Sequence, residues 1–91
     1  MAVLRAGYRV YLLRNSQNRR YVGVSSDVER RLAQHNAGVS RWTRGRGPWQ
    51  LVWQSVPMSL GEARQLENRL KRQKGGNGLE YYLRHQSALR S

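Results

Sequence analysis

Two short apolar runs near the start of the chain are separated by polar residues. Residues 8–14 (YRVYLLR) and 20–24 (RYVGV) are rich in β-branched, aromatic and leucine side chains, which is typical of strands. The polar cluster at 15–18 (NSQN) predicts a turn between them, so we expect a hairpin. Gly23 in the second run indicates a bulge or the close approach of another backbone.

A third strand is predicted over 49–56 (WQLVWQSV). Because side chains alternate along a strand, one side of it is expected to carry Leu51, Trp53 and Ser55 and the other Val52 and Gln54. Trp53 is expected in the core. The preceding segment, 39–48 (VSRWTRGRGP), is a basic loop rich in glycine.

Apolar residues spaced by three and four predict a helix after the hairpin. Ser26 and Glu29 form a capping-box pattern at its start, with Asp27 near the positive end of the helix dipole. Gly38 fits just after its end. The apolar stripe consists of Val28, Leu32 and either His35 or Asn36.

A second helix is predicted after the third strand. Ser59 and Glu62 form another capping-box pattern, and the helix extends to about Gln73. Its buried stripe is expected to consist of Leu60, Ala63, Leu66 and Leu70. Residues 79–89 form a candidate short terminal helix after a glycine-rich break. The order ββαβα, with or without this last helix, predicts an α/β (α+β layered) fold in which helices flank a small sheet, with 1–91 as a single domain.

The charge of the chain points to a polyanionic partner. Its 91 residues include 17 Lys and Arg but only 5 Asp and Glu, for a formal net charge of +12. Such a charge repels itself and attracts polyanions, and nucleic acid is favoured because cations that neutralise phosphates release counterions. An anionic membrane surface is the alternative, but it favours cations on one helix face, whereas arginine is spread along this chain.

Several other classes of protein are excluded. The chain has no cysteine, which excludes a disulfide scaffold, thiolate zinc sites and cysteine nucleophiles. No apolar run approaches the roughly 20 residues of a membrane span. The first thirteen residues are interrupted by Arg5 and Arg9 and do not resemble a secretory signal. We therefore expect a cytoplasmic protein.

The few acidic residues limit what kind of metal site is available. A two-metal nuclease needs several bridging carboxylates, whereas Glu29 and Glu62 are already explained by helix starts. A single ion on one carboxylate is compatible with this composition, because Mg²⁺ keeps waters and needs only one or two protein carboxylates. Glu67, beside the apolar stripe of the second helix, is the candidate.

Five polar side chains form a candidate phosphodiesterase site. Tyr11 and Tyr21, on adjacent predicted strands, are placed to reach one face, and Arg31 and His35 project from one helix face a turn apart. With Glu67 they supply a metal-binding carboxylate, a guanidinium for the charge on the phosphorane, and a phenol or imidazole to take a proton from water.

The motifs resemble the GIY-YIG nuclease superfamily, and most of all its small stand-alone members. The resemblance covers about residues 8–74 and rests on the order and spacing of five segments: 9–11 (RVY), 21–23 (YVG), 29–32 (ERRL), 35–36 (HN) and 62–67 (EARQLE). The first motif has Arg9 where the family has glycine, and the second has Val22 for isoleucine. Arg9 would contact a phosphate or face the solvent.

The resemblance implies a three-stranded antiparallel sheet, one divalent metal ion (Mg²⁺ or Mn²⁺) and hydrolysis of DNA that leaves a 5′-phosphate. It implies that Tyr11 is a general base, with His35 as the alternative, and that Tyr21 positions water or phosphate. It further implies that Arg31 stabilises the transition state, that Glu67 binds the metal, and that Asn77 is the candidate for a later family asparagine.

Each candidate also has an ordinary structural interpretation. Tyr11 and Tyr21 would be ordinary aromatic residues of the sheet, and Arg31 would be a surface charge. His35 would be a cation at the helix end, and Glu67 would form an ion pair with Lys71.

Further residues are candidates for binding nucleic acid. Trp42 lies among arginines, which suits stacking on an unpaired base, although it would equally serve as a packing anchor for its loop. Cations at the end of the second helix would hold phosphates without reading sequence. The candidates are Arg30, Trp42, Arg44, Arg46, Arg69, Lys71, Arg72, Lys74 and Asn77.

The sequence therefore predicts a metal-dependent DNA endonuclease with little sequence specificity, favouring single-stranded or structured (branched) DNA and without an obligate protein partner. The alternatives are a catalytically silent module that binds nucleic acid in the same groove, and a basic surface protein that binds membranes or acidic partners. Only the nuclease requires Glu67.

Overall fold

The computed structural model describes residues 7–72 and contains three strands and two helices. In chain order they are β1 (Arg9–Arg14), β2 (Arg20–Ser25), α1 (Val28–Asn36), β3 (Gln50–Gln54) and α2 (Leu60–Arg72). The strands form an antiparallel sheet in the order β2-β1-β3, so the predicted α+β fold is confirmed. The candidate terminal helix at 79–89, Lys74 and Asn77 lie outside the described residues.

The hairpin of β1 and β2 is fixed by its turn. Asn15 Oδ1 accepts hydrogen bonds from the backbone N–H groups of Gln17 and Arg19, at 3.0 and 2.8 Å. Asn18 adopts a positive φ of 65°, a conformation that asparagine tolerates better than most residues. The resulting register is uninterrupted and pairs Tyr11 with Gly23. The bulge considered for Gly23 is therefore absent.

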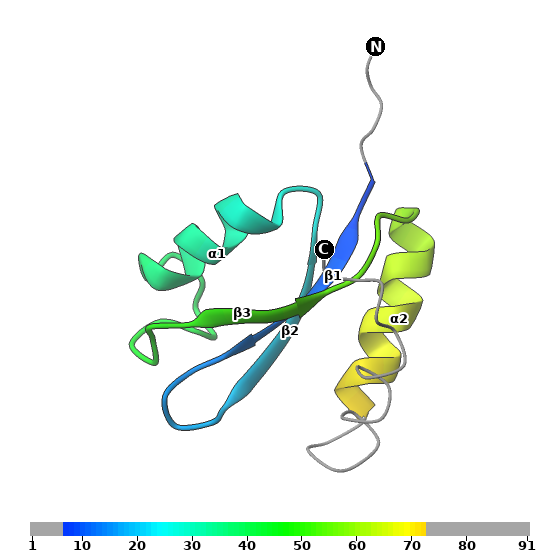
Figure 1. Cartoon of the computed structure of the whole chain (residues 1–91). Helices are drawn as coiled ribbons and strands as arrows, with labels where there is room; N and C mark the ends of the chain where they lie inside the picture. Colours follow the sequence, from blue (N-terminus) through cyan, green and yellow to red (C-terminus); the bar gives the residue numbers. More distant parts are fainter. Residues whose placement is uncertain (1–6, 73–91) are drawn as a thin grey trace.

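The two helices lie on opposite sides of the sheet (Figure 1). Side chains of β1 alternate between the faces. Val10 and Leu12 pack with Ala63, Leu66 and Leu70 of α2. On the other face, Tyr11 and Leu13 form a second cluster with Val28 of α1 and with Trp49. The central strand therefore supplies the core of both layers.

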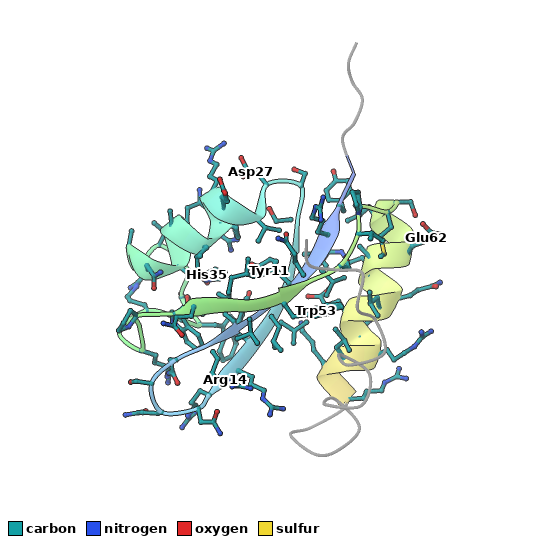
Figure 2. The ribbon with its side chains drawn as sticks, viewed as in Figure 1. Tyr11, Arg14, Asp27, His35, Trp53 and Glu62 are labelled. Carbon is teal, nitrogen blue, oxygen red and sulfur yellow. The ribbon has the colours of Figure 1, made fainter. Side chains whose placement is uncertain are left out.

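The prediction for the faces of β3 is wrong in one respect. Leu51 packs with the α1-side cluster, whereas Trp53 packs with the α2-side cluster, as Figure 2 shows for Trp53. The register shifts between Leu12, which pairs with Trp53, and Leu13, which pairs with Leu51. A bulge of this kind places an extra residue in one strand and reverses the side-chain alternation beyond it.

The start of α1 also differs from the prediction. The N-cap is Asp27, whose Oδ1 accepts a hydrogen bond of 3.1 Å from the Arg30 backbone N–H. Ser26 does not form the predicted capping box, because Ser25 Oγ instead accepts a bond of 2.9 Å from the Asp27 N–H and shifts the cap by one residue. His35, rather than Asn36, completes the buried stripe.

At α2 the predicted capping box is present. Ser59 Oγ accepts from the Glu62 backbone N–H at 3.1 Å, and Glu62 Oε1 accepts from the Ser59 backbone N–H at 3.2 Å. Leu60, however, is exposed and does not belong to the buried stripe. It stands in the first turn of the helix, before α2 packs on the sheet. Neither described helix is long and apolar enough to span a membrane.

Loop 39–48 is held by the residue that follows it. Trp49 is only 4% exposed and donates from Nε1 to the Thr43 carbonyl at 3.1 Å. Asn36 holds the Trp49 backbone on both sides, since its Oδ1 accepts from Trp49 N–H and its Nδ2 donates to Trp49 C=O. Trp49 therefore anchors the loop. Trp42 is 75% exposed, so it is not the packing anchor considered from the sequence.

Candidate active site

The phenol of Tyr11 lies across its neighbouring strand. A Cβ atom placed on Gly23 would stand 2.5 Å from the Tyr11 hydroxyl oxygen, closer than such atoms approach. The close approach expected at Gly23 therefore exists, but it is made by a side chain and not by a backbone. Glycine at this position allows Tyr11 to extend over β2, the edge strand.

A buried chain of hydrogen bonds joins Tyr11 to loop 39–48. Tyr11 Oη lies 2.8 Å from His35 Nε2, and His35 Nδ1 lies 2.7 Å from Thr43 Oγ1. All three side chains are almost completely buried. Figure 2 shows His35 and Tyr11 side by side between α1 and the sheet. Thr43 was not predicted from the sequence, because nothing in a basic loop indicates which hydroxyl turns inward.

Tyr21 completes an aromatic cluster with these residues. Its ring centroid lies 4.7 Å from that of His35 in an edge-on arrangement, and 6.2 Å from that of Tyr11. The tyrosine is half-buried, so its ring packs while part of it faces solvent. The predicted convergence of Tyr11, Tyr21 and His35 is therefore observed.

The surroundings of Tyr11 keep its phenol protonated. Burial raises the pKa of Tyr11 to about 12, and Tyr21 and, to a smaller degree, Glu67 add to this increase. The charge and hydrogen bonding of Arg31 act in the opposite direction and lower the pKa. At neutral pH Tyr11 is therefore a neutral hydroxyl that can donate one proton. Glu67 belongs to α2, which packs on the opposite face of the sheet from the Tyr11 cluster.

His35 is affected in the opposite direction. Burial, and then the charge of Arg31, lowers the pKa of His35 below its usual 6.5, so that the imidazole is neutral near pH 7. Arg31 itself is half-buried and donates from Nη1 to Gln34 Oε1 at 2.7 Å. The helix-end cation interpretation of His35 does not fit a buried, neutral ring.

Glu67 is a buried carboxylate, only 7% exposed. Its Oε1 lies 3.4 Å from Arg64 Nη1 and its Oε2 lies 3.1 Å from Lys71 Nζ. The ion pair with Lys71 considered from the sequence is therefore present. The other described acids, Asp27, Glu29 and Glu62, are exposed in the first turns of helices or just before them.

Within residues 7–72 no group of three or more acidic or histidine side chains is placed to hold a metal ion. A divalent ion at Glu67 would thus have one protein carboxylate, with water and phosphate oxygens as its other ligands. Mg²⁺ commonly binds in this way. Both carboxylate oxygens are paired with cations of α2, so a metal ion would have to displace Arg64 or Lys71. The single buried carboxylate fits one divalent ion on that condition.

A hollow of about 580 Å³ opens beside Tyr21, and we call it the basic hollow. Its cations are Arg19, Arg20, Arg46 and Lys71, and its other lining residues are Tyr21, Trp42, Thr43 and Trp49. Three predicted DNA-binding residues, Trp42, Arg46 and Lys71, therefore come together. Arg19 and Arg20 were missed, although the signal was present as two cations directly before the Tyr21 motif.

The remaining described candidates do not line this hollow. Arg30 is exposed on α1, and Arg69 and Arg72 are exposed on α2. Arg44 is exposed and donates from Nε to the Gly38 carbonyl at 3.0 Å.

Comparison with known proteins identifies the family. The GIY-YIG catalytic domain matches residues 7–80, which is most of the chain. The chain belongs to the GIY-YIG family. GIY-YIG domains are nuclease domains that act on DNA and generally depend on divalent metal ions.

Similar proteins carry the name UPF0213. A UPF0213 protein of Aeromonas salmonicida is 46% identical over 67 residues, covering 72% of this chain and 49% of that protein. A UPF0213 protein of Vibrio cholerae is 43% identical over 74 residues, covering 78% and 72%. For the first of these relatives, the matched region spans about half of the relative's length.

A solved structure confirms the fold of this GIY-YIG domain. The solution NMR structure of the UPF0213 protein BH0048 from Bacillus halodurans superimposes with a TM-score of 0.55 at 29% identity, covering 90% of this chain and 88% of that one. Arg9, which stands where the family motif has glycine, forms a contact within the fold. Arg9 Nη1 donates to the Ser55 carbonyl at 2.9 Å, which ties β1 to the segment after β3.

Proposed function

We propose that this chain is a divalent-metal-dependent DNA endonuclease with little sequence specificity, acting in the cytoplasm without an obligate protein partner and using 1–91 as one catalytic domain. The observation that carries the proposal is the 2.8 Å hydrogen bond between the Tyr11 hydroxyl and His35 Nε2. It pairs a protonated phenol with a neutral imidazole, in a fold whose family hydrolyses DNA.

The pair provides a route for the proton of the attacking water. With the His35 proton on Nδ1 and donated to Thr43 Oγ1, Nε2 is free to accept from the Tyr11 hydroxyl. As the water oxygen bonds to phosphorus, its proton passes to Tyr11 Oη while the phenol proton passes to Nε2. This route needs no free phenolate, which a pKa of about 12 makes scarce at neutral pH.

The remaining groups act on charge and position. The Arg31 guanidinium stabilises the negative charge that grows on the phosphoryl oxygens as the bond to the 3′-oxygen breaks. Tyr21, half exposed beside His35, positions water or phosphate. Glu67 would hold one Mg²⁺ or Mn²⁺ ion, which when bound supplies Lewis-acid polarisation of the phosphate and neutralises the leaving oxygen.

One observation favours the second candidate, a catalytically silent module that binds nucleic acid. Both oxygens of Glu67 are paired with cations of its own helix, so the carboxylate already has partners. A nuclease requires that a metal ion compete with them. A silent module requires only the basic hollow and its neighbouring cations.

A nicking assay separates the two candidates. Supercoiled plasmid and circular single-stranded DNA are incubated with Mg²⁺ or Mn²⁺ and wild type, Glu67→Gln or Glu29→Gln. We expect cleavage by wild type and by the Glu29 control, which alters an exposed residue in the first turn of α1, and loss of cleavage in Glu67→Gln. Cleavage that survives in Glu67→Gln would contradict the metal assignment. DNA binding without cleavage by wild type would favour the silent module.

A further inference from the structure

The basic hollow is lined by three separate parts of the chain. Arg19 comes from the end of the hairpin turn and Arg20 from the start of β2. Trp42 and Arg46 come from loop 39–48, and Lys71 comes from the last turn of α2. The described residues that line it include four cations and no acid. Its electrostatic complement is therefore an anion, and its size falls within the range of about 300–1,000 Å³ that is typical of pockets for one small ligand.

The loop that bears Trp42 is fixed at several points. Thr43 is bonded to His35 through its hydroxyl and to Trp49 through its carbonyl. The Arg46 carbonyl accepts a bond of 3.0 Å from Asn15 Nδ2 in the hairpin turn, and Arg46 Nη1 donates to the Trp42 carbonyl at 3.0 Å. Trp42 is therefore exposed on a tethered loop. A large apolar ring kept in water by a fixed backbone is a platform for a flat ligand.

Two lining residues connect the hollow to the candidate active site. Tyr21 forms part of its wall and packs edge-on against His35. Lys71 forms another part and lies 3.1 Å from Glu67 Oε2. A strand that occupies the hollow would therefore lie next to Tyr21 and to Lys71, the ion-pair partner of Glu67.

We propose that the basic hollow is a subsite for one unpaired nucleotide next to the scissile phosphate, with its base stacked on Trp42 and its phosphate held by Arg19 and Arg46. The position of this subsite relative to the cleaved bond rests on the proposed function. The nucleotide is unpaired because stacking on an indole needs the face of a base, and a base inside a duplex offers a protein only its groove edges.

Binding measurements without divalent metal test the subsite. A fluorescein-labelled oligothymidylate and a duplex of equal length are titrated in EDTA with wild type, Trp42→Ala, Trp42→Phe and Arg41→Ala. Stacking energies predict that Trp42→Ala weakens single-strand binding about 5- to 150-fold. Duplex affinity should be unchanged, and Trp42→Phe should retain most of the single-strand affinity. Arg41→Ala is the matched control, because Arg41 is an exposed neighbour that does not line the hollow.

The cations have a separate readout. The salt dependence of single-strand binding is the slope of log Kobs against log[salt]. Removing one phosphate contact makes this slope less steep by about 0.7, and we expect this change for Arg19→Ala. Because Trp42 is exposed, Trp42→Ala should keep the thermal unfolding midpoint of wild type.

Unchanged single-strand affinity in Trp42→Ala would overturn the subsite, and so would equal losses on single strand and duplex. The test is independent of cleavage. If wild type never cuts DNA but Trp42→Ala loses single-strand affinity selectively, the subsite stands and the nuclease proposal fails.

Discussion

The ammonium nitrogen of Lys71 lies 3.1 Å from Glu67 Oε2, one turn away on α2, and the same lysine lines the basic hollow. It thus occupies one side of the only buried carboxylate among residues 7–72. A cation held there competes with a divalent ion for the same oxygen. A DNA phosphate that drew the lysine into the hollow would leave Glu67 Oε2 open to a metal ion, while Arg64 would still pair with Oε1.

This relationship predicts that Lys71→Met binds Mn²⁺ more tightly than wild type in the absence of DNA. Since an exposed ion pair contributes about 0.2–1 kcal/mol, the gain should reach at most about fivefold. Electron paramagnetic resonance of free Mn²⁺ measures it. Arg69→Met, which removes an exposed cation from the same helix, is the control. Equal Mn²⁺ affinity in wild type and both variants would rule out the competition.

The hydrogen bond between Tyr11 and His35 predicts the effect of Tyr11→Phe. The change removes the hydroxyl that relays the proton and should lower kcat by about 10²- to 10⁴-fold. It also leaves buried His35 Nε2 without its partner, which costs about 1–3 kcal/mol of stability. Single-turnover cleavage and urea unfolding measure the two effects. Tyr8→Phe, at a more exposed tyrosine, should change neither. Full activity in Tyr11→Phe would transfer the role of general base to His35.

The approach of the Tyr11 ring to Gly23 predicts that Gly23→Ala disrupts the site. The new methyl group would stand 2.5 Å from the Tyr11 hydroxyl and 2.6 Å from its Cζ, so the ring must move away from His35. Overpacking of this kind costs about 1–3 kcal/mol, and the misplaced hydroxyl should reduce cleavage. Gly61→Ala is the matched control, since a Cβ there meets nothing within 4 Å. Its stability should be equal to wild type or slightly higher.

The lowered pKa of His35 predicts how stability depends on pH. In the unfolded chain the histidine titrates near 6.5, whereas burial and Arg31 keep it neutral to lower pH in the folded protein. Below pH 6.5 the unfolded state therefore binds more protons, so this contribution to stability is complete above that pH and is lost as the pH falls toward the folded pKa.

Urea unfolding between pH 5.5 and 8 measures this effect. We expect the wild-type free energy of unfolding to fall on the acid side of this window, and His35→Gln to show a smaller decrease. A decrease of the same size in both proteins would show that other groups cause it. Arg31→Gln removes the second influence on the imidazole, brings the folded pKa of His35 closer to its unfolded value, and should make the acid-side decrease smaller than in wild type.

The sequence predicted the parts of the site that regular elements position. A hairpin with a short turn brings Tyr11 and Tyr21 to one face, and one helical turn separates Arg31 from His35; both arrangements follow from periodicity. The sequence also indicates a close approach at Gly23, but it does not show that the approaching group is the Tyr11 side chain. Local spacing was sufficient wherever strands and helices determine direction.

The rest depends on contacts between segments that are distant in sequence. Thr43 faces His35 because Trp49 and Asn15 hold its loop, and no periodicity in 39–48 encodes those bonds. The bulge in β3, which separates Leu51 from Trp53, arises from pairing with β1. The cap of α1 was misplaced by one residue because Ser25, Ser26 and Asp27 are all good capping residues.

Trp42 and Thr43 are consecutive residues with opposite surroundings, one turned to water and the other 1% exposed against His35. A base stacked on the indole, as proposed, would therefore lie one peptide unit away from the hydroxyl that bonds to the imidazole. Substrate length should consequently matter for the rate of the chemical step as well as for affinity. A fragment too short to reach Trp42 is expected to show a reduced kcat even at saturation.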